Sequence, residues 1–118
     1  FWENGVLFMK GNYDNGEQEG FWVSYNDEGF LDNEGYYKSG KKHGIWRRYS
    51  YGQLVYEGEY KNGKQDGSWV EYWLNENLYR KGEFKNGNKE GRWVQYSIDG
   101  VISTEKSGVF KDGVKISD

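Results

Sequence analysis

A tryptophan recurs at nearly constant intervals along the chain, and this spacing limits the possible folds more than any other feature of the sequence. Successive copies are 24, 23 and 24 residues apart. The four positions are Trp22, Trp46, Trp69 and Trp93. A fixed period of this length is the signature of stacked structural repeats, in which each unit packs mainly against its neighbours.

A glycine opens each copy of the repeat, and these glycines mark the boundaries of the units. The opening glycines are Gly11, Gly35, Gly58, Gly82 and Gly108. The first to fourth units are residues 11–34, 35–57, 58–81 and 82–107, with half units at 1–10 and 108–118. We therefore expect one repeat array over residues 1–118, and the half units lead us to expect a fragment of a longer protein.

Side chains alternate around each opening glycine with the period of two that is typical of a β-strand. Tyr56, Gly58 and Tyr60 fall on one face of such a strand. The segment before Gly108 is two residues longer than its counterparts. An insertion of two residues preserves the alternation, whereas an insertion of one would reverse it. The pattern therefore predicts strands throughout the array.

Turn residues follow these strands. The pairs are Asn15-Gly16, Asn62-Gly63, Asn86-Gly87 and Asp112-Gly113. Such residues tolerate the positive φ that tight reversals require. We place the start of a second, aromatic strand at the next glycine of each unit. These glycines are Gly20, Gly44, Gly67 and Gly91. Each unit is therefore predicted to be a β-hairpin.

A glycine in the middle of a strand usually weakens it, so its regular recurrence opposite a tryptophan needs a physical reason. We expect each indole to lie across the bare backbone of the opening glycine, for example at Gly35, Gly58 or Gly82. The tyrosine three residues after each tryptophan should emerge on the opposite face. A single hairpin is marginally stable in water. The predicted fold is therefore all-β: an elongated, single-layer, strongly twisted antiparallel sheet of tandem β-hairpins with aromatic residues on both faces.

The pattern Gly-x-Tyr-x-Asn-Gly-x-x-x-Gly-x-Trp-x-x-Tyr, seen at residues 58–72 and followed by Gly-x-Leu elsewhere, resembles the bacterial variant form of the MORN repeat. The array is also similar to that of bacterial proteins labelled YwqK-type antitoxins, and the resemblance covers nearly the whole chain. Departures are Glu76 before Leu78, Ser39 in place of Asn, and the insertion at 101–107. The resemblance implies a scaffold, a lipid-associating module or an oligomerising module, and an antitoxin role by label.

The sequence offers little for catalysis. It has no cysteine, and His43 is its one histidine, which excludes disulfides, thiolate metal sites and histidine-based triads within these residues. The acidic group around residues 14–28 lacks the ligand ladder of a calcium loop, and the glycine-rich turns lack a phosphate-binding motif. We therefore predict no enzymatic activity, no cofactor and no metal.

Aromatic and basic residues gather in the second unit and suggest an interface. We predict that partner-binding residues are Trp46, Arg47, Arg48, Tyr49, Tyr51 and Trp73. The first unit carries seven acidic residues and no Lys or Arg, whereas the second carries five basic residues against Glu57. Such a charge step can steer a partner. The net charge of −3 argues against nucleic acid.

The predicted function is a non-catalytic repeat scaffold that presents a long face of exposed Tyr, Trp and Arg to a protein partner. Self-association is also predicted, because an open sheet leaves strand edges unpaired. Three alternatives stay open: a cell-surface carbohydrate, adhesion or lipid-associating module; an antitoxin or immunity-like protein; and a spacer that only sets distance. The sequence does not assign a cellular location.

Overall fold

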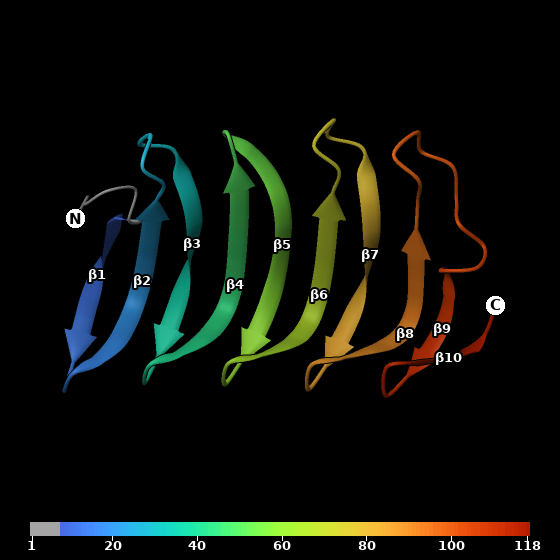
Figure 1. Cartoon of the computed structure of the whole chain (residues 1–118). Helices are drawn as coiled ribbons and strands as arrows, with labels where there is room; N and C mark the ends of the chain where they lie inside the picture. Colours follow the sequence, from blue (N-terminus) through green and yellow to red (C-terminus); the bar gives the residue numbers. More distant parts are fainter. Residues whose placement is uncertain (1–7) are drawn as a thin grey trace.

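Residues 8–118 form ten β-strands in one antiparallel sheet, as the computed structural model in Figure 1 shows. The strands are β1 (Phe8–Asp14), β2 (Glu17–Tyr25), β3 (Leu31–Lys38), β4 (Lys41–Ser50), β5 (Gln53–Lys61), β6 (Lys64–Tyr72), β7 (Leu78–Lys85), β8 (Asn88–Gln95), β9 (Gly108–Lys111) and β10 (Val114–Ser117). Residues 1–7, which make up most of the expected half unit 1–10, lie outside the described residues.

Each strand pairs with the next one along the chain, so the hairpins follow one another in sequence order. The resulting layer measures 46 × 31 × 18 Å. The prediction of an all-β, elongated, single-layer array of tandem hairpins is therefore confirmed. The part of the chain from residue 8 onward contains no helix that is long and apolar enough to cross a membrane.

Two-residue turns close the hairpins along one edge of the sheet, which we call the hairpin edge. The first turn residue has a φ of 51° or 52° in all five hairpins. These residues are Asn15, Ser39, Asn62, Asn86 and Asp112. Ser39 therefore adopts the same left-handed conformation as the Asn residues, and this departure from the repeat pattern leaves the turn unchanged.

The second strand of each hairpin begins earlier than the sequence predicted. We expected it to start at Gly20, Gly44, Gly67 or Gly91, but it starts directly after the turn, and the glycine lies inside it. The four glycines have φ values of 78°, 84°, 113° and 74°, which interrupt the alternation of side chains. That interruption led to the wrong boundary, since ladder pairing continues on both sides of the glycine.

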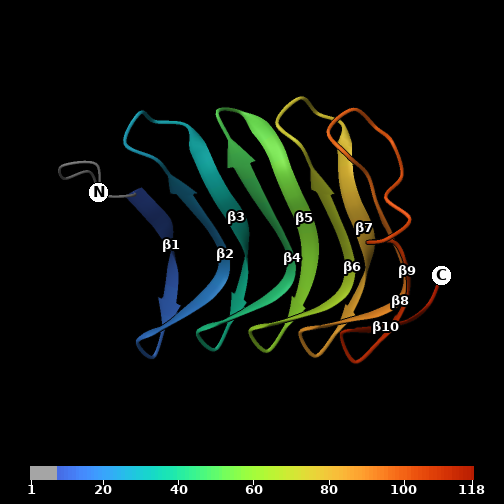
Figure 2. The same cartoon turned by 45° about the vertical axis from the view of Figure 1, so that its right-hand side comes forward.

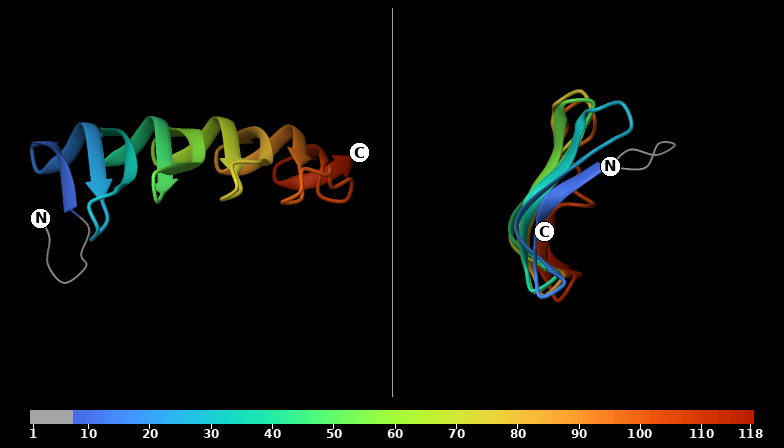
Figure 3. Two further views of the ribbon diagram at one scale, coloured as in Figure 1. Left: turned by 90° about the horizontal axis from the view of Figure 1, so that it is seen from above. Right: turned by 90° about the vertical axis from the view of Figure 1, so that its left-hand side faces the viewer.

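The glycine marks a bulge. Gly35 pairs with Trp46, whereas Tyr37 pairs with Lys42. Between these two pairs the chain advances by four residues in β4 but by only two in β3. Bulges bend the strand that carries the extra residues. All hairpins bend at the same level, and the sheet is curved when it is seen from its end (Figure 3, right). Figure 2 shows the same curvature along the whole array.

The sheet curves toward the face that carries the tryptophans. Lys42 and Trp46 would have Cα atoms about 13 Å apart in a straight strand. The Lys42 Nζ nevertheless lies 4.6 Å from the centre of the Trp46 ring. The strand therefore bends toward these two side chains. We call this concave side the inner face and the opposite side the outer face.

The predicted contact between indole and glycine is confirmed. A Cβ atom at Gly11, Gly35, Gly58 or Gly82 would lie 2.0–2.3 Å from the indole of the paired strand. Each tryptophan also pairs with the opening glycine of the following unit, as Trp46 does with Gly58. Glycine and tryptophan thus alternate along the inner face, and the rings fill the space that the missing side chains leave.

The tryptophans form the core. Their exposed fractions are only 1–4%, although one layer of sheet has no second layer to cover them. The cover comes from aromatic rings of the same face, most of which meet the indoles edge to face. The centroid of Trp46 lies 5.0 Å from that of Tyr37, and Phe84 lies 4.9 Å from Trp93. The expectation of periodically exposed tryptophans at the repeat positions was therefore wrong.

Candidate functional site

The six residues that the sequence marked for partner binding occupy three different places. Trp46 and Arg48 belong to the inner face, Arg47 and Tyr49 to the outer face, and Tyr51 and Trp73 to the connections beyond the strand ends. Consecutive residues of a strand point to opposite faces, so the adjacent letters Arg47 and Arg48 do not form one basic patch. Their role in partner binding stays a prediction, and the geometry decides which of them could act together.

On the outer face, Arg47 is neutralised by the neighbouring strands. Its guanidinium forms ion pairs with Glu57 and, at 3.7 Å, with Glu34. Tyr49 donates a hydrogen bond to the same Glu34 carboxylate at 2.8 Å. Desolvation first, then the hydrogen bond to Glu34, raises the pKa of Tyr49 to about 12. The charge of Arg47, one of the five basic residues of the second unit, is thus neutralised within the sheet and is not available to a partner as a free positive charge.

The connections between hairpins form the other edge of the sheet, which we call the loop edge. Residues 26–30 and 73–77 are five-residue loops and residues 96–107 form a longer connection, but Tyr51 and Gly52 make a tight turn in which Tyr51 has a φ of 49°. This turn is shorter than the five-residue loops while β4 and β5 are longer than their counterparts, and together these differences give the 23-residue spacing between Trp46 and Trp69. Figure 1 shows these connections side by side along the top of the sheet.

Large apolar side chains line the loop edge, and we call them the loop-edge strip. Their exposed fractions lie between 44% and 72%. The members are Phe30, Tyr51, Leu74, Ile98 and Val101. The rings of Phe30 and Tyr51 are in contact, with centroids 6.2 Å apart.

Hydrogen bonds join two neighbouring connections of this edge, residues 73–77 and 96–107. The side-chain amides of Asn75 and Asn77 both donate to the Ile98 carbonyl oxygen, each at 3.0 Å. The Trp73 indole N–H donates to the Tyr96 carbonyl oxygen at 3.2 Å. Trp73, predicted as a binding residue, is half-buried and helps to join the two connections, and its role in binding stays a prediction.

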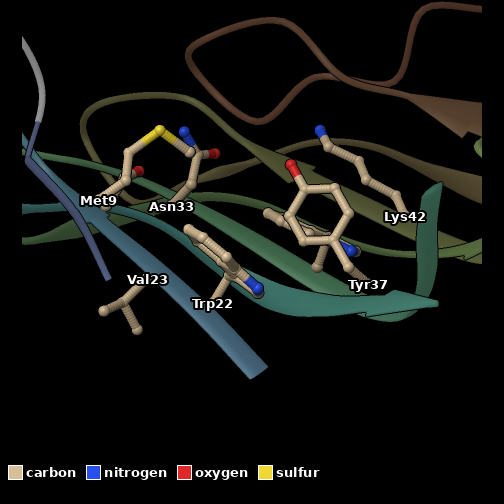
Figure 4. A pocket seen from close by; sticks show the side chains of 8 residues that line it. Met9, Trp22, Val23, Asn33, Tyr37 and Lys42 are labelled. Carbon is tan, nitrogen blue, oxygen red and sulfur yellow. The ribbon is translucent and has the colours of Figure 1, made fainter. Parts of the chain in front are cut away.

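The inner face contains a small hollow of about 130 Å³ between β1 and β4. Figure 4 shows Met9 and Asn33 on one side of the Trp22 ring and Tyr37 and Lys42 on the other. Trp46, Val23 and the buried Ser24 complete the lining. The walls are thus largely aromatic, with an amide and an ammonium group among them. We call this site the inner-face hollow.

Lys42 carries an uncompensated charge at this hollow. Its Nζ lies over the rings of Trp46 and Tyr60, at 4.6 and 5.0 Å. Within residues 8–118 no carboxylate forms an ion pair with it. Desolvation lowers the pKa of Lys42, and the positive charge of nearby Arg48 lowers it further. Two cations therefore share this part of the inner face.

The corresponding lysine of the fourth unit has similar surroundings. Lys89 lies over Trp93 and Phe110 at 5.0 and 4.8 Å, which repeats the aromatic contacts of Lys42. Burial and then the positive charge of Arg80 lower its pKa, Glu71 opposes that shift, and Lys106 adds to it. Both lysines are thus partly buried cations over aromatic rings with a second cation nearby, and neither forms an ion pair within the described residues.

The described residues hold no group of three or more His, Cys, Asp or Glu side chains that could bind a metal ion. His43 lies in β4, and its Nδ1 is buried without a hydrogen-bond partner among those residues.

Sequence reasoning missed the inner-face hollow and most of the loop-edge strip. Lys42 entered only as one of the five basic residues of the second unit, and Phe30, Leu74 and Ile98 were not singled out. One signal was available: Gln18, Lys42, Gln65 and Lys89 alternate at one repeat position. Comparison with known proteins adds no candidate, because no protein-family model and no curated protein matches the chain.

Proposed function

We propose that this protein is a non-catalytic repeat scaffold that binds a protein partner, and that the loop-edge strip is its principal contact. The observation that carries the proposal is the line of exposed apolar side chains on the loop edge, where two of the connections are hydrogen-bonded to each other and the rings of Phe30 and Tyr51 are in contact. Exposed apolar patches of this kind mark interaction sites when they are contiguous. The MORN-like character of the array and its bacterial origin remain parts of this proposal, supported by the residue pattern alone.

Rigidity favours binding at this edge. Association orders side chains and loops, and this ordering opposes binding. The hydrogen bonds from Asn75 and Asn77 to Ile98 hold two loops in place before a partner arrives. The tight turn at Tyr51 likewise presents its ring from a short connection. Binding at this edge would therefore cost less conformational entropy than binding to long free loops.

The alternatives receive unequal support. Carbohydrate binding usually needs an exposed aromatic ring face, and the repeat tryptophans are buried. Lipid association, an antitoxin role and a pure spacer role rest on the resemblance or on general reasoning alone. Self-association through the same strip is the variant closest to our proposal, and the experiment below separates the two.

The test is site-specific photo-crosslinking in the native host. A photoreactive phenylalanine replaces Tyr51 on the loop edge in one strain and Asn62 on the hairpin edge in a second. We expect a discrete crosslinked protein from position 51 that position 62 does not give. The triple change Tyr51→Ser, Leu74→Ser and Ile98→Ser is then combined with a crosslinker at position 30, and it should abolish the product.

Two results would contradict the proposal. Equal crosslinking from both edges would show that the strip has no preference for a partner. A product that consists only of two copies of this chain, together with a dimer in sedimentation experiments, would assign the strip to self-association instead.

A further inference from the structure

We infer that the inner-face hollow is a receptor for one carboxylate side chain, a glutamate or aspartate, that the partner protein presents. The inference rests on the proposed function, because the carboxylate side chain is taken to belong to the protein partner. It concerns a different surface from the loop-edge strip, so the two can fail separately.

The size of the hollow selects a side chain over a free ligand. Its volume of about 130 Å³ equals roughly four water molecules at about 30 Å³ each. Pockets that hold drug-sized molecules span about 300–1,000 Å³. A single side chain with a few methylene groups fits this space, whereas a cofactor or nucleotide does not.

The lining selects an acid. The methylene groups of a glutamate can pack against Trp22 and Met9, while its carboxylate meets the ammonium group of Lys42. Arg48 strengthens the positive potential from the next inner-face position of the same strand. Asp32, next to the lining residue Asn33 in the chain, accepts a hydrogen bond from the Asn33 amide at 3.0 Å. It makes no ion pair with Lys42 or Arg48 in the described chain.

The Lys42 ammonium group is partly buried and has no ion-pair partner in the described chain, which favours an anionic ligand. A charge that leaves bulk water without an opposite charge is unfavourable, and proteins generally pair such groups. The contact with Trp46 and Tyr60 compensates Lys42 in part. An incoming carboxylate would supply the missing opposite charge.

The position of the hollow agrees with binding at the loop edge. Ser24 and Asn33 lie near the loop edge, where the connection between β2 and β3 carries Phe30, whereas Tyr37 and Lys42 lie next to the hairpin turn at the opposite edge. A partner seated on Phe30 and Tyr51 must therefore extend a segment across the inner face to bring an acidic side chain to Lys42. The strip would supply apolar contact, and the hollow would supply charge specificity.

The test uses a single-residue probe on the whole chain. N-acetyl-glutamate N-methylamide is titrated into the isotopically labelled protein while the indole N–H signals are followed by NMR. We expect saturable shifts at Trp22 and Trp46 with a dissociation constant in the millimolar range. The neutral glutamine analogue should bind at least about tenfold more weakly, because it lacks the charge-assisted contact.

Two matched variants assign the effect. Lys42→Gln introduces the residue that the first and third units already have at this position, so folding should be preserved, and circular dichroism checks this. It should weaken the probe at least about tenfold. Lys89→Gln makes the same chemical change in the fourth unit and should leave the affinity unaltered.

The inference is overturned if the probe gives no saturable shifts at Trp22 and Trp46, if the glutamine analogue binds equally well, or if Lys42→Gln retains the wild-type affinity. Loss of the loop-edge crosslink with intact probe binding would contradict only the proposed function. Intact crosslinking without probe binding would contradict only the inference that the hollow binds a carboxylate.

Discussion

Trp69 donates its indole N–H to the carboxylate of Glu71 at 2.8 Å, whereas the equivalent tryptophans donate to backbone carbonyl oxygens. Those acceptors are the oxygens of Asn12, Tyr36 and Glu83. The Trp69 ring is also stacked on Tyr56, with centroids 4.7 Å apart, in place of an edge contact there. One unit of the array thus orients its central indole differently, and a side chain determines that orientation.

We predict that Glu71→Ala destabilises the protein by about 1.5–3 kcal/mol, the usual range for a hydrogen bond to a charged group. Glu71 accepts from Trp69 and also pairs with Arg80 at 2.7 Å, so its removal leaves two donors without their acceptor. Urea unfolding measures the change. Glu83→Ala removes the same charge from an exposed outer position and should stay within about 0.5 kcal/mol of wild type. Equal effects would refute the role of Glu71.

Gly58→Ala should be more destabilising than Gly29→Ala, although Gly29 has the conformation that disfavours a side chain. A Cβ at Gly58 would lie 2.0 Å from the Trp69 ring, whereas a Cβ at Gly29 meets nothing within 4 Å. The left-handed φ of Gly29 limits its change to about 1–2 kcal/mol. Overpacking at Gly58 should reach about 3 kcal/mol or more. Thermal unfolding of the two variants in parallel decides the order, and the reverse order would contradict the glycine–indole packing.

His43→Glu should stabilise the array by about 0.5–1.5 kcal/mol. An acid stands at this repeat position in the other units and accepts the backbone N–H of the next hairpin turn. Glu19 accepts from Ser39 at 2.9 Å, and Asp66 accepts from Asn86 at 3.2 Å. His43 makes no such bond, and its Nδ1 has no partner in residues 8–118.

The reciprocal change, Glu19→His, should destabilise the protein by a similar amount. Chemical denaturation of both variants at neutral pH supplies the comparison. If His43→Glu leaves stability unchanged while Glu19→His lowers it, the turn of the third unit must be held in some other way.

Lys64→Glu should stabilise the hairpin edge by about 0.2–1 kcal/mol, because Lys61 and Lys64 pair directly across the turn and like charges repel there. The gain should shrink as salt is added, since both side chains are exposed and screened. Lys85 faces Asn88 instead. Lys85→Glu is therefore the control, and a gain of equal size there would assign the effect to net charge.

The ionisation of Tyr49 should appear late in an alkaline titration, at a pKa of about 12. The unfolded chain releases this proton near its ordinary value of about 10. The neutral form is thus favoured by folding: its contribution to stability is present below about pH 10 and is lost as the pH rises through 12. Tyr49→Phe should remove this part of the alkaline destabilisation, and Glu34→Gln should lower the pKa of Tyr49 in the same NMR titration. An unchanged profile in both variants would contradict the contact.

The sequence alone determined the repeat length, the strand class, the turns and the contact of indole with glycine. These features depend on residues within one hairpin, where alternation, positive-φ residues and the missing side chain of Gly58 act over short distances. Even Ser39, which departs from the pattern, kept the turn that its neighbours dictate.

Only the tertiary structure decided the curvature and the candidate sites. The bulge at Gly44 looked like a strand start because a glycine with positive φ interrupts alternation without ending the ladder. Curvature and the neighbouring rings buried Trp46, and no carboxylate of the described strands forms an ion pair with Lys42. The separation of Arg47 from Arg48, by contrast, follows from strand alternation alone. The surroundings of Trp46 and Lys42 depend on which units lie side by side, because neighbouring strands supply the rings and the charges around each residue. A single unit does not contain that information.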